Sequence, residues 1–379
     1  MRILIVGAGI GGLSLAAFLK DTNVEYDIVE KCPDWSHQGF LIAMWDSGRD
    51  ILKKLGLAEE FDKRGTRIQK YSLRDGTGKL LREYDFSEFY AEYGSAMTAI
   101  LRSDLHAWLL SRVDTSRIKM DTSITELQEE TDSIRVVFTN GEVQRYDVVV
   151  GADGVHSKVR SLTFSGQIES YENWRIWYLW IDHKYDIPGT ATEYAEPGEL
   201  IFVFSGAGKT AAWLFAPADH AQWDNEHGRA ARLKRIFKEE SKLMPRMLEH
   251  INDADIVPSD LVSLSLKTWH TGRIALLGDA AHNFGPHAGI GGGMALEDGY
   301  VLAGELLQVS ATYPLESALA TYEHKRRTRI KLAEYLSKRI RQGTLIQSPF
   351  MRHTFNLMLR FVPVGFFKRS LMQLLGQEI

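Results

Sequence analysis

The sequence predicts an α/β fold, α+β overall, in which a parallel sheet carries an inserted antiparallel sheet and a helical segment ends the chain. Three observations predict it. Residues 1–31 read as a strand, a glycine turn, a helix and a second strand. Two later apolar runs, at 147–150 and 274–277, each lead into a glycine and an aspartate. Residues 174–215 carry alternating aromatic side chains, which is typical of antiparallel strands.

The first thirty residues predict a dinucleotide site of the Rossmann-like kind. Gly7 permits a tight turn, Gly9 lets backbone approach a pyrophosphate, and Gly12 lets the helix pack close to the sheet. Glu30 ends the second strand, at the distance where an acid binds ribose hydroxyls. The pattern leaves NAD, NADP and FAD open. A secretory signal peptide is disfavoured, because three glycines interrupt the apolar run.

Composition excludes several classes of protein. The 379 residues carry a formal net charge of -4, which gives no reason to expect a nucleic-acid partner. Cys32 is the single cysteine, so the sequence excludes an internal disulfide and a cysteine-rich metal site, and we predict no bound metal. No apolar run is long enough for a transmembrane segment. These features favour a cytoplasmic protein.

Between the first and second strand–glycine units, the pattern is mixed. Residues 39–64 predict a loop followed by a helix, and 68–84 predict two short strands around a turn at 75–78. Ser103 is a good N-cap, so Arg102 is expected just before a helix and, taken alone, reads as a surface arginine. Residues 134–143 predict a hairpin that turns at Asn140-Gly141.

The two later strand–glycine segments contain further candidate ligand-binding residues. The run 147–150 enters Gly151-Ala152-Asp153-Gly154, a second loop suited to phosphate or ribose. The run 274–277 enters Gly278-Asp279, and a glycine cluster from Gly289 then opens a helix that runs past Leu307. Such a cluster at a helix start allows backbone contact with a flat ring or an anion. A charged helix is expected at 312–342, and the basic, apolar tail 348–379 is expected to pack over the protein rather than to touch a membrane surface.

The aromatic strands suggest one wall of a substrate pocket. The candidates for this wall are Tyr178, Phe204, Trp213 and Phe215. Plain sheet core is the commoner role for any single aromatic residue, so the choice rests on the aromatic-rich face as a whole.

With these three loops, the sequence resembles the group A FAD-dependent aromatic hydroxylases. These flavoprotein monooxygenases are related to p-hydroxybenzoate hydroxylase and include salicylate hydroxylase-like and tetracycline-inactivating members. The resemblance covers residues 1 to about 335. It rests on GAGIGG at 7–12 with Glu30, on GADGVHSKVR at 151–160, and on GDAAH at 278–282 followed by Pro286, the glycines and Glu297-Asp298.

The resemblance implies FAD as cofactor, with NADPH or NADH as a transient co-substrate. It also implies contact between Arg102 and FAD, which replaces the surface role. The expected cofactor-binding residues are Gly7, Gly9, Ile10, Gly11, Gly12, Glu30, Lys31, Arg102, Asp153, Asp279, Pro286, Gly289, Gly291 and Gly292. Residues 1–70, 98–165 and 267–335 would form the FAD-binding domain, 71–97 and 166–266 the substrate-binding domain, and 336–379 the C-terminal helical segment.

The implied reaction inserts one oxygen atom from O2 into an aromatic or polyketide-like small molecule through a flavin C4a-hydroperoxide. His287 is the positional candidate for a base, and His282 is expected to stabilise its loop. Salicylate-type hydroxylation and tetracycline-type inactivation both stay open, as do a reductase without oxygen activation and a non-catalytic FAD carrier. Monomer and homo-oligomer are equally compatible with the sequence.

Two departures from the family pattern stand out. Ile290 and Gly293 occupy positions where many relatives carry a polar residue. Residues 177–182, WYLWID, do not match the Trp-x-Trp-x-Ile-Pro signature of flavin-dependent halogenases, so halogenation is not expected.

Overall fold

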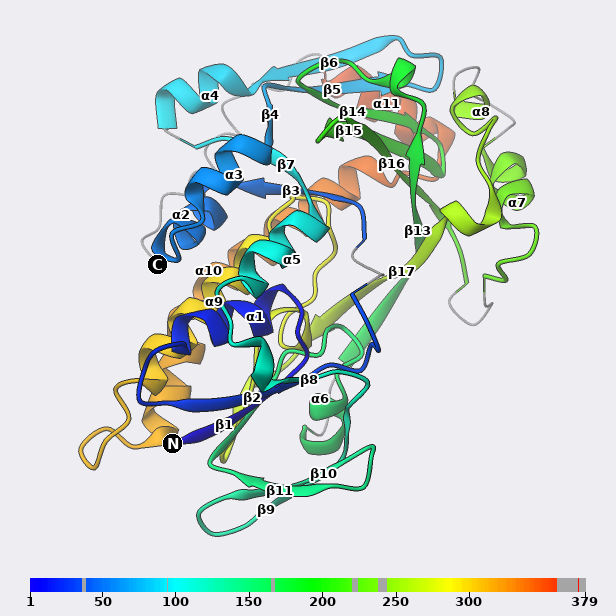
Figure 1. The fold of residues 1–379 in the computed structure, drawn as a ribbon. Helices are drawn as coiled ribbons and strands as arrows, with labels where there is room; N and C mark the ends of the chain where they lie inside the picture. Colours follow the sequence, from blue (N-terminus) through cyan, green and yellow to red (C-terminus); the bar gives the residue numbers. More distant parts are fainter. Residues whose placement is uncertain are drawn as a thin grey trace.

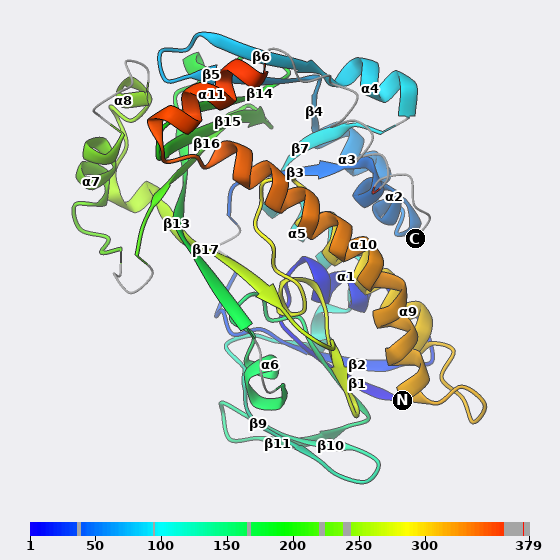
Figure 2. The same cartoon turned by 180° about the vertical axis from the view of Figure 1, so that it is seen from behind.

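The computed structural model describes residues 1–35, 39–93, 95–164, 168–219, 224–237, 244–359 and Leu374. Two sheets dominate it, a parallel sheet and a larger antiparallel one, and the long helix α10 (Leu315–Thr344) runs along both (Figures 1 and 2). At one end of α10 the Tyr322 hydroxyl donates to the Leu276 carbonyl of the parallel sheet, and at the other Arg341 pairs with Glu172 of the antiparallel sheet. The helix therefore ties the two sheets together.

The parallel sheet confirms the predicted strand–turn–helix–strand unit. Strand β1 pairs in parallel with β2 and with β12, β12 pairs in parallel with β19, and β2 with β8, while β18 joins the edge antiparallel. Its strands are β1 (Arg2–Val6), β2 (Glu25–Val29), β8 (Ile118–Lys119), β12 (Val148–Gly151), β18 (His270–Thr271) and β19 (Ile274–Leu276). The central strands are buried on both faces, as expected for continuous apolar runs.

Helices cover one face of this sheet and a small sheet covers the other (Figure 1). The helices are α1 (Ile10–Leu19), α5 (Arg102–Leu110) and α9 (Gly291–Leu306), and α9 packs against both α1 and α10. The small sheet is β9 (Ile124–Glu129), β10 (Ile134–Phe138) and β11 (Val143–Tyr146). Its β10–β11 hairpin is the predicted one, and Gly141 adopts a φ of +84° in the turn.

The second sheet has seven strands, in the order β17-β13-β16-β15-β14-β5-β6. Its strands are β5 (Lys70–Asp75), β6 (Leu80–Asp85), β13 (Ile168–Ile181), β14 (Thr190–Glu196), β15 (Glu199–Gly206), β16 (Lys209–Pro217) and β17 (Val257–Ser265). Every pairing is antiparallel except β14 with β5. The predicted fold class is therefore confirmed, and the predicted strands at 68–84 join this sheet.

Two local predictions were wrong. Residues 39–64 contain strand β3 (Leu41–Trp45) before α2 (Asp46–Lys54) and α3 (Ala58–Arg64), and β3 pairs with β7 (Met97–Leu101), which also pairs with β4 (Thr66–Ile68). The run LIAMW is a short buried strand without alternation, which periodicity alone does not reveal. Helix α5 begins at Arg102 after Leu101, and the Ser103 side chain does not cap it.

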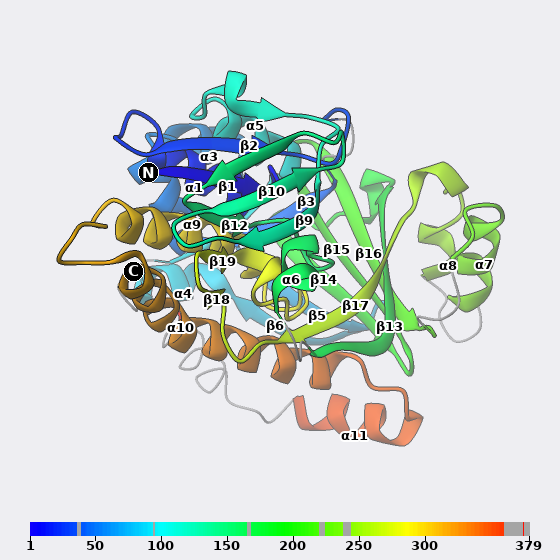
Figure 3. The same cartoon turned by 90° about the horizontal axis from the view of Figure 1, so that it is seen from below.

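The remaining helices lie at the periphery. They are α4 (Phe86–Tyr93), α6 (Lys158–Thr163), α7 (Arg229–Ile236), α8 (Met244–Met247) and α11 (Pro349–Leu359). Figure 3 shows α7 and α8 at the end of the molecule farthest from the parallel sheet, and α11 following α10. Of the expected C-terminal segment, residues 360–373 and 375–379 lie outside the described residues. No helix in the described ranges is long and apolar enough to cross a bilayer.

Candidate functional site

A large cavity opens where the parallel strands end. Its volume is about 670 Å³, within the usual range for a ligand pocket. The loops after β1, β2, β12 and β19 line it, together with the start of α9 and residues of the antiparallel sheet. Three segments that are far apart in the sequence therefore enclose one space, as the sequence predicted for a long cofactor.

The first glycine loop leaves open room for a ligand. Gly7 has a φ of +107°, and a Cβ there would lie 2.5 Å from the Ala152 carbonyl oxygen. A Cβ on Gly9 would meet no atom within 4 Å, and no side chain caps the helix that follows it. Gly12 does not line the cavity, because it packs α1 against the strand: its Cβ would lie 2.0 Å from the Gly7 carbonyl oxygen. The free N–H groups at the start of α1 suit a phosphate.

Glu30 is fixed at the edge of the cavity by two backbone amides. Its Oε2 accepts from the Ala8 N–H at 2.9 Å and its Oε1 from the Cys32 N–H at 3.0 Å. Lys31 follows and also lines the cavity. The carboxylate is thus held beside the glycine turn, where the ribose of a dinucleotide is expected.

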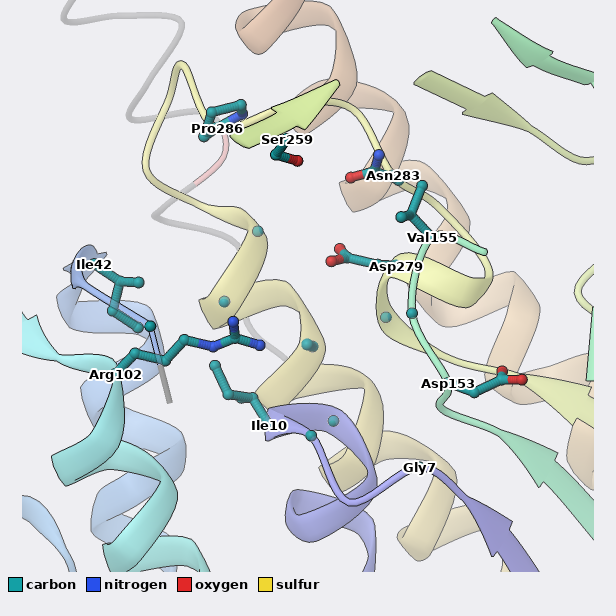
Figure 4. A pocket seen from close by; sticks show the side chains of 18 of the residues that line it. Gly7, Ile10, Ile42, Arg102, Asp153, Val155, Ser259, Asp279, Asn283 and Pro286 are labelled. Atoms are coloured by element: carbon teal, nitrogen blue, oxygen red, sulfur yellow. The ribbon is translucent and has the colours of Figure 1, made fainter. Parts of the chain in front are cut away.

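Asp153 supports its own loop. Its Oδ2 accepts from the backbone N–H groups of Lys158 at 2.6 Å and Val159 at 3.1 Å, and its Oδ1 accepts from the Ser157 hydroxyl. The carboxylate therefore caps the start of α6 and points away from Arg102 and Asp279 (Figure 4). Asp153 lines the cavity, but its carboxylate already accepts hydrogen bonds from Ser157 and from the start of α6.

Arg160, which the sequence did not single out, connects this loop to the next. It is buried, with 1% of its surface exposed, and donates to the Ala280 carbonyl at 3.0 Å, to the Val155 carbonyl and to Glu169. The guanidinium thus fastens the 151–160 loop to the carbonyl next to Asp279. The predicted motif contained Arg160, but only the fold shows what it binds.

Asp279 and Arg102 point into the cavity from opposite sides (Figure 4). The Asp279 carboxylate is accessible because it opens onto the cavity, yet the surrounding protein raises its pKa, and His282 and Arg102 partly oppose that shift. Both groups can therefore meet the middle of a long ligand that begins at the glycine turn.

The third glycine segment forms a second open helix start. Pro286, Gly289, Gly291 and Gly292 line the cavity, and Gly289 adopts a φ of +64°. A Cβ on Gly291 would meet no atom within 4 Å, and no side chain caps α9. The positive end of this sixteen-residue helix therefore faces the same space as the start of α1.

A buried ionic network holds the Gly278-Asp279 turn. Asp298 accepts from the Gly278 N–H at 2.9 Å, from His282 Nε2 at 2.5 Å and from Arg326 Nε at 2.7 Å. Arg326 also donates to Glu297 at 2.6 Å. His282 stabilises its loop, as predicted. No sequence pattern pointed to Arg326, because it lies 28 residues beyond Asp298 on another helix.

A row of side chains crosses four strands of the antiparallel sheet beside the cavity. Tyr178 pairs with Trp213, Trp213 with Phe202, and Phe202 with Glu193, and directly opposed residues share a face of the sheet. Tyr178 and Trp213, two of the residues proposed for the substrate wall, line the large cavity. Burial raises the pKa of Tyr178 to about 12, so its hydroxyl stays protonated at neutral pH.

Phe204 was a wrong choice for the wall. It is fully buried beside the row, with its ring 5.2 Å from that of Trp213, and it lines neither cavity. Alternation along β15 places Phe202 and Phe204 on one face, but only Phe202 reaches a cavity. The sequence could not tell which of the two would do so.

A smaller cavity of about 30 Å³ adjoins the large one, and Trp213 and Pro286 line both. Phe215 and His287, two of the predicted residues, line the small cavity only. Tyr71, Glu193 and Phe202 line it as well and were missed. Burial, with a smaller contribution from Arg341, lowers the pKa of His287 to about 3, so the imidazole is neutral at physiological pH and a weak base.

Comparison with known proteins identifies the family. The family model described as FAD binding domain matches residues 1–337. The chain is 28% identical over 346 residues to the FAD-dependent urate hydroxylase of Klebsiella pneumoniae, covering 87% of each. It is 26% identical over 367 residues to the 2-heptyl-3-hydroxy-4(1H)-quinolone synthase of Pseudomonas aeruginosa, covering 96% of this chain and 94% of that protein.

Solved structures show the same fold. The HpxO structure from Klebsiella pneumoniae with FAD and uric acid superposes with a TM-score of 0.87 at 22% identity, covering 99% of this chain and 96% of that one. The tetracycline destructase Tet(51) superposes with a TM-score of 0.77 at 20% identity, covering 100% and 98%. The matched family model, the motifs and the fold agree, and the chain belongs to the FAD binding domain family, as a group A flavoprotein monooxygenase.

Proposed function

We propose that this protein uses NADPH or NADH and O2 to insert one oxygen atom into an aromatic small molecule bound between the start of α9 and the row of aromatic side chains. The observation that carries the proposal is a shared space: Gly291 at the helix start and Tyr178 and Trp213 on the sheet line the same large cavity. A flat ring held against the helix start would face an aromatic wall.

The residues present fit FAD, the cofactor of this family. Gly7, Gly9 and the start of α1 would hold the pyrophosphate, and Glu30 the adenosine ribose. The start of α9 would stabilise the negative charge of the reduced ring. When bound, FAD supplies the redox and oxygen chemistry, while the chain orients the reactants and excludes water.

The sheets support the predicted division of the chain. The strands of the parallel sheet all come from 1–70, 98–165 and 267–335, and those of the seven-stranded sheet come almost entirely from 71–97 and 166–266. We propose that these parts bind FAD and substrate respectively. Helix α10 runs without a break across residue 335 into the C-terminal segment. We also propose a cytoplasmic location, which the single cysteine supports.

The relatives favour a hydroxylase over the alternatives. A reductase without oxygen activation is not favoured, because the similar proteins named above are a urate hydroxylase and a quinolone synthase. At 20% identity, the tetracycline destructase shares only its fold with this chain. Tetracycline inactivation is therefore ranked second, behind hydroxylation of another aromatic molecule. The purified yellow protein should consume O2 and NADPH together when it meets its substrate. NADPH loss without O2 loss, with a saturated product, would support the reductase.

Replacing Asp279 and Asp153 should give different phenotypes. Asp279→Asn removes a charged acceptor from the cavity, so we expect FAD binding to weaken about tenfold, from the loss of about 1.5 kcal/mol. Asp153→Ala removes a helix cap, so we expect the free energy of unfolding to fall by about 1 kcal/mol. Flavin fluorescence titration and chemical denaturation measure the two effects. Equal effects of both changes on FAD affinity would contradict the roles assigned here.

A further inference from the structure

The small cavity contains a buried carboxylate that the FAD site does not use. Glu193 is 4% exposed and accepts a hydrogen bond from the Tyr71 hydroxyl at 2.6 Å. Burial raises the pKa of Glu193 to about 7, although Tyr71 and Arg352 oppose the shift. A carboxyl group with a pKa near neutrality can accept or release a proton under physiological conditions.

Other polar atoms around the same cavity have no partner. Trp213 Nε1 and both ring nitrogens of His287 are buried without a hydrogen bond within the described part of the chain. Buried polar atoms are nearly always paired, so three orphans around one space point to a polar ligand edge. Trp213 offers a donor, and the neutral imidazole offers one donor and one acceptor.

The volumes of the two cavities determine which part of a ligand each can hold. A cavity of about 30 Å³ holds one or two waters or a ring substituent, but not an aromatic ring. Trp213 and Pro286 line both cavities, so a ring in the large cavity can extend a polar substituent into the small one. The aromatic row leads directly there, because Glu193 is its last member on the same face.

The charged groups around the small cavity restrict the charge that a substrate can carry. Among the described residues, those that line the small cavity include no lysine or arginine. A carboxylated substrate would add a second negative charge beside the Glu193 carboxylate in a buried space, which is unfavourable. An uncharged substrate that transfers a proton to Glu193 keeps the total charge unchanged. The titratable and charged groups that act on Glu193 are Tyr71 of β5, Tyr84 of β6 and Arg352 of α11. His287, in the loop before α9, lines the same cavity, and Arg341 of α10 acts on His287.

We propose that Glu193 is the base of the reaction: it accepts the proton of a ring hydroxyl or ring N–H group of an uncharged aromatic substrate. The substrate O–H or N–H bond breaks, an O–H bond forms on the carboxylate, and the electron pair stays on the substrate, which becomes electron-rich. Tyr71 fixes the carboxylate, while Trp213 and His287 hold the polar edge of the ring. This assignment rests on the proposed monooxygenase function and moves the role of base from His287 to Glu193.

The test compares wild-type holoenzyme with Glu193→Gln, Glu193→Asp and the control Tyr194→Phe. Tyr194 is also buried and follows Glu193 on β14, so its side chain lies on the opposite face of the sheet, and it lines neither cavity. The probes are 4(1H)-quinolone and phenol, which stay uncharged over almost all of the pH range used, against salicylate and 6-hydroxynicotinate, which carry a carboxylate. Product mass, NADPH loss and O2 loss are followed from pH 5.5 to 9.

We expect wild-type product formation from the uncharged probes to rise with pH and level off above about 7. Glu193→Gln should lower it at least about 100-fold and abolish this pH dependence, with FAD content unchanged. Glu193→Asp should restore part of the rate, and Tyr194→Phe should behave as wild type.

Three results would overturn the assignment. They are a Glu193→Gln rate within threefold of wild type, an unchanged pH profile in that variant, and turnover confined to the carboxylated probes. A yellow wild-type protein that consumes no O2 with any probe would instead contradict the proposed monooxygenase function, on which the assignment depends. The two failures are therefore distinguishable.

Discussion

Replacing Gly9 with valine is expected to abolish tight FAD binding while leaving the apoprotein stable. Gly9 has an extended backbone, with φ of -75° and ψ of -173°, which valine adopts without strain. A Cβ there would meet no protein atom within 4 Å, so the new side chain would occupy only the ligand space. It would displace phosphate from the amides at the start of α1. Two lost charge-assisted hydrogen bonds cost about 3 kcal/mol or more, roughly a hundredfold in affinity.

The matched control for this experiment is Gly304→Val. Gly304 lies in α9, and a Cβ there also meets nothing within 4 Å, but it does not line the cavity. The flavin released on denaturation, titration of the apoprotein with FAD, and urea unfolding of both apoproteins together measure the effect. Full flavin occupancy in Gly9→Val would show that the glycine turn is not where the cofactor binds.

Replacing Arg326 with methionine is expected to give the largest loss of stability. Arg326 is 1% exposed and neutralises Asp298 and Glu297, both fully buried. Removing the guanidinium leaves two carboxylates short of a partner, which costs about 3–5 kcal/mol. The Gly278 amide is bound to Asp298, so the loop that carries Asp279 should also loosen and FAD affinity should fall.

The pH dependence of stability should change in the same variant. Burial raises the pKa of Asp298, but His282 and Arg326 outweigh it and hold that pKa at about 2. A lowered carboxyl pKa stabilises the fold above the unfolded value, about 4, and the gain is lost as pH falls toward 2. Arg326→Met should weaken this contribution, so its stability should vary less across that range.

Denaturation of the Arg326→Met apoprotein is compared with that of Lys325→Met. Lys325 pairs with Glu305 at 2.7 Å but is half exposed, so its loss should cost no more than about 1 kcal/mol. Equal losses in the two variants would mean that the buried network does not carry the stability assigned to it.

The sequence predicted the parallel-sheet part of the molecule well. Glycine turns and buried parallel strands follow local rules, so Gly7, Gly9, Asp279 and Gly291 could be placed at one edge of the sheet before the fold was known. Of the residues expected to bind the cofactor, Gly12 was the only one found outside the large cavity, for the packing reason that the sequence had also suggested.

The arrangement of the antiparallel sheet depends on register, which no local pattern carries. Tyr178, Trp213, Phe202 and Glu193 come from four strands and form one row only after those strands pair. Aromatic content pointed to two members of the row, but nothing marked Glu193, one of many acidic residues in the chain. Its partner Tyr71 lies 122 residues away. Arg326, the buried ionic partner of Asp298, was hidden because the two residues lie on different helices and no local pattern connects them.

The central claim is that this cavity supports monooxygenation by bound FAD, and one measurement tests it most directly. Purified yellow protein is supplied with NADPH, an uncharged aromatic substrate and O2 made of the heavy oxygen isotope in ordinary water. We expect a product that contains one heavy oxygen atom, with one O2 consumed for each product formed. A product with oxygen from water, or a reduced product formed without O2 consumption, would contradict the claim.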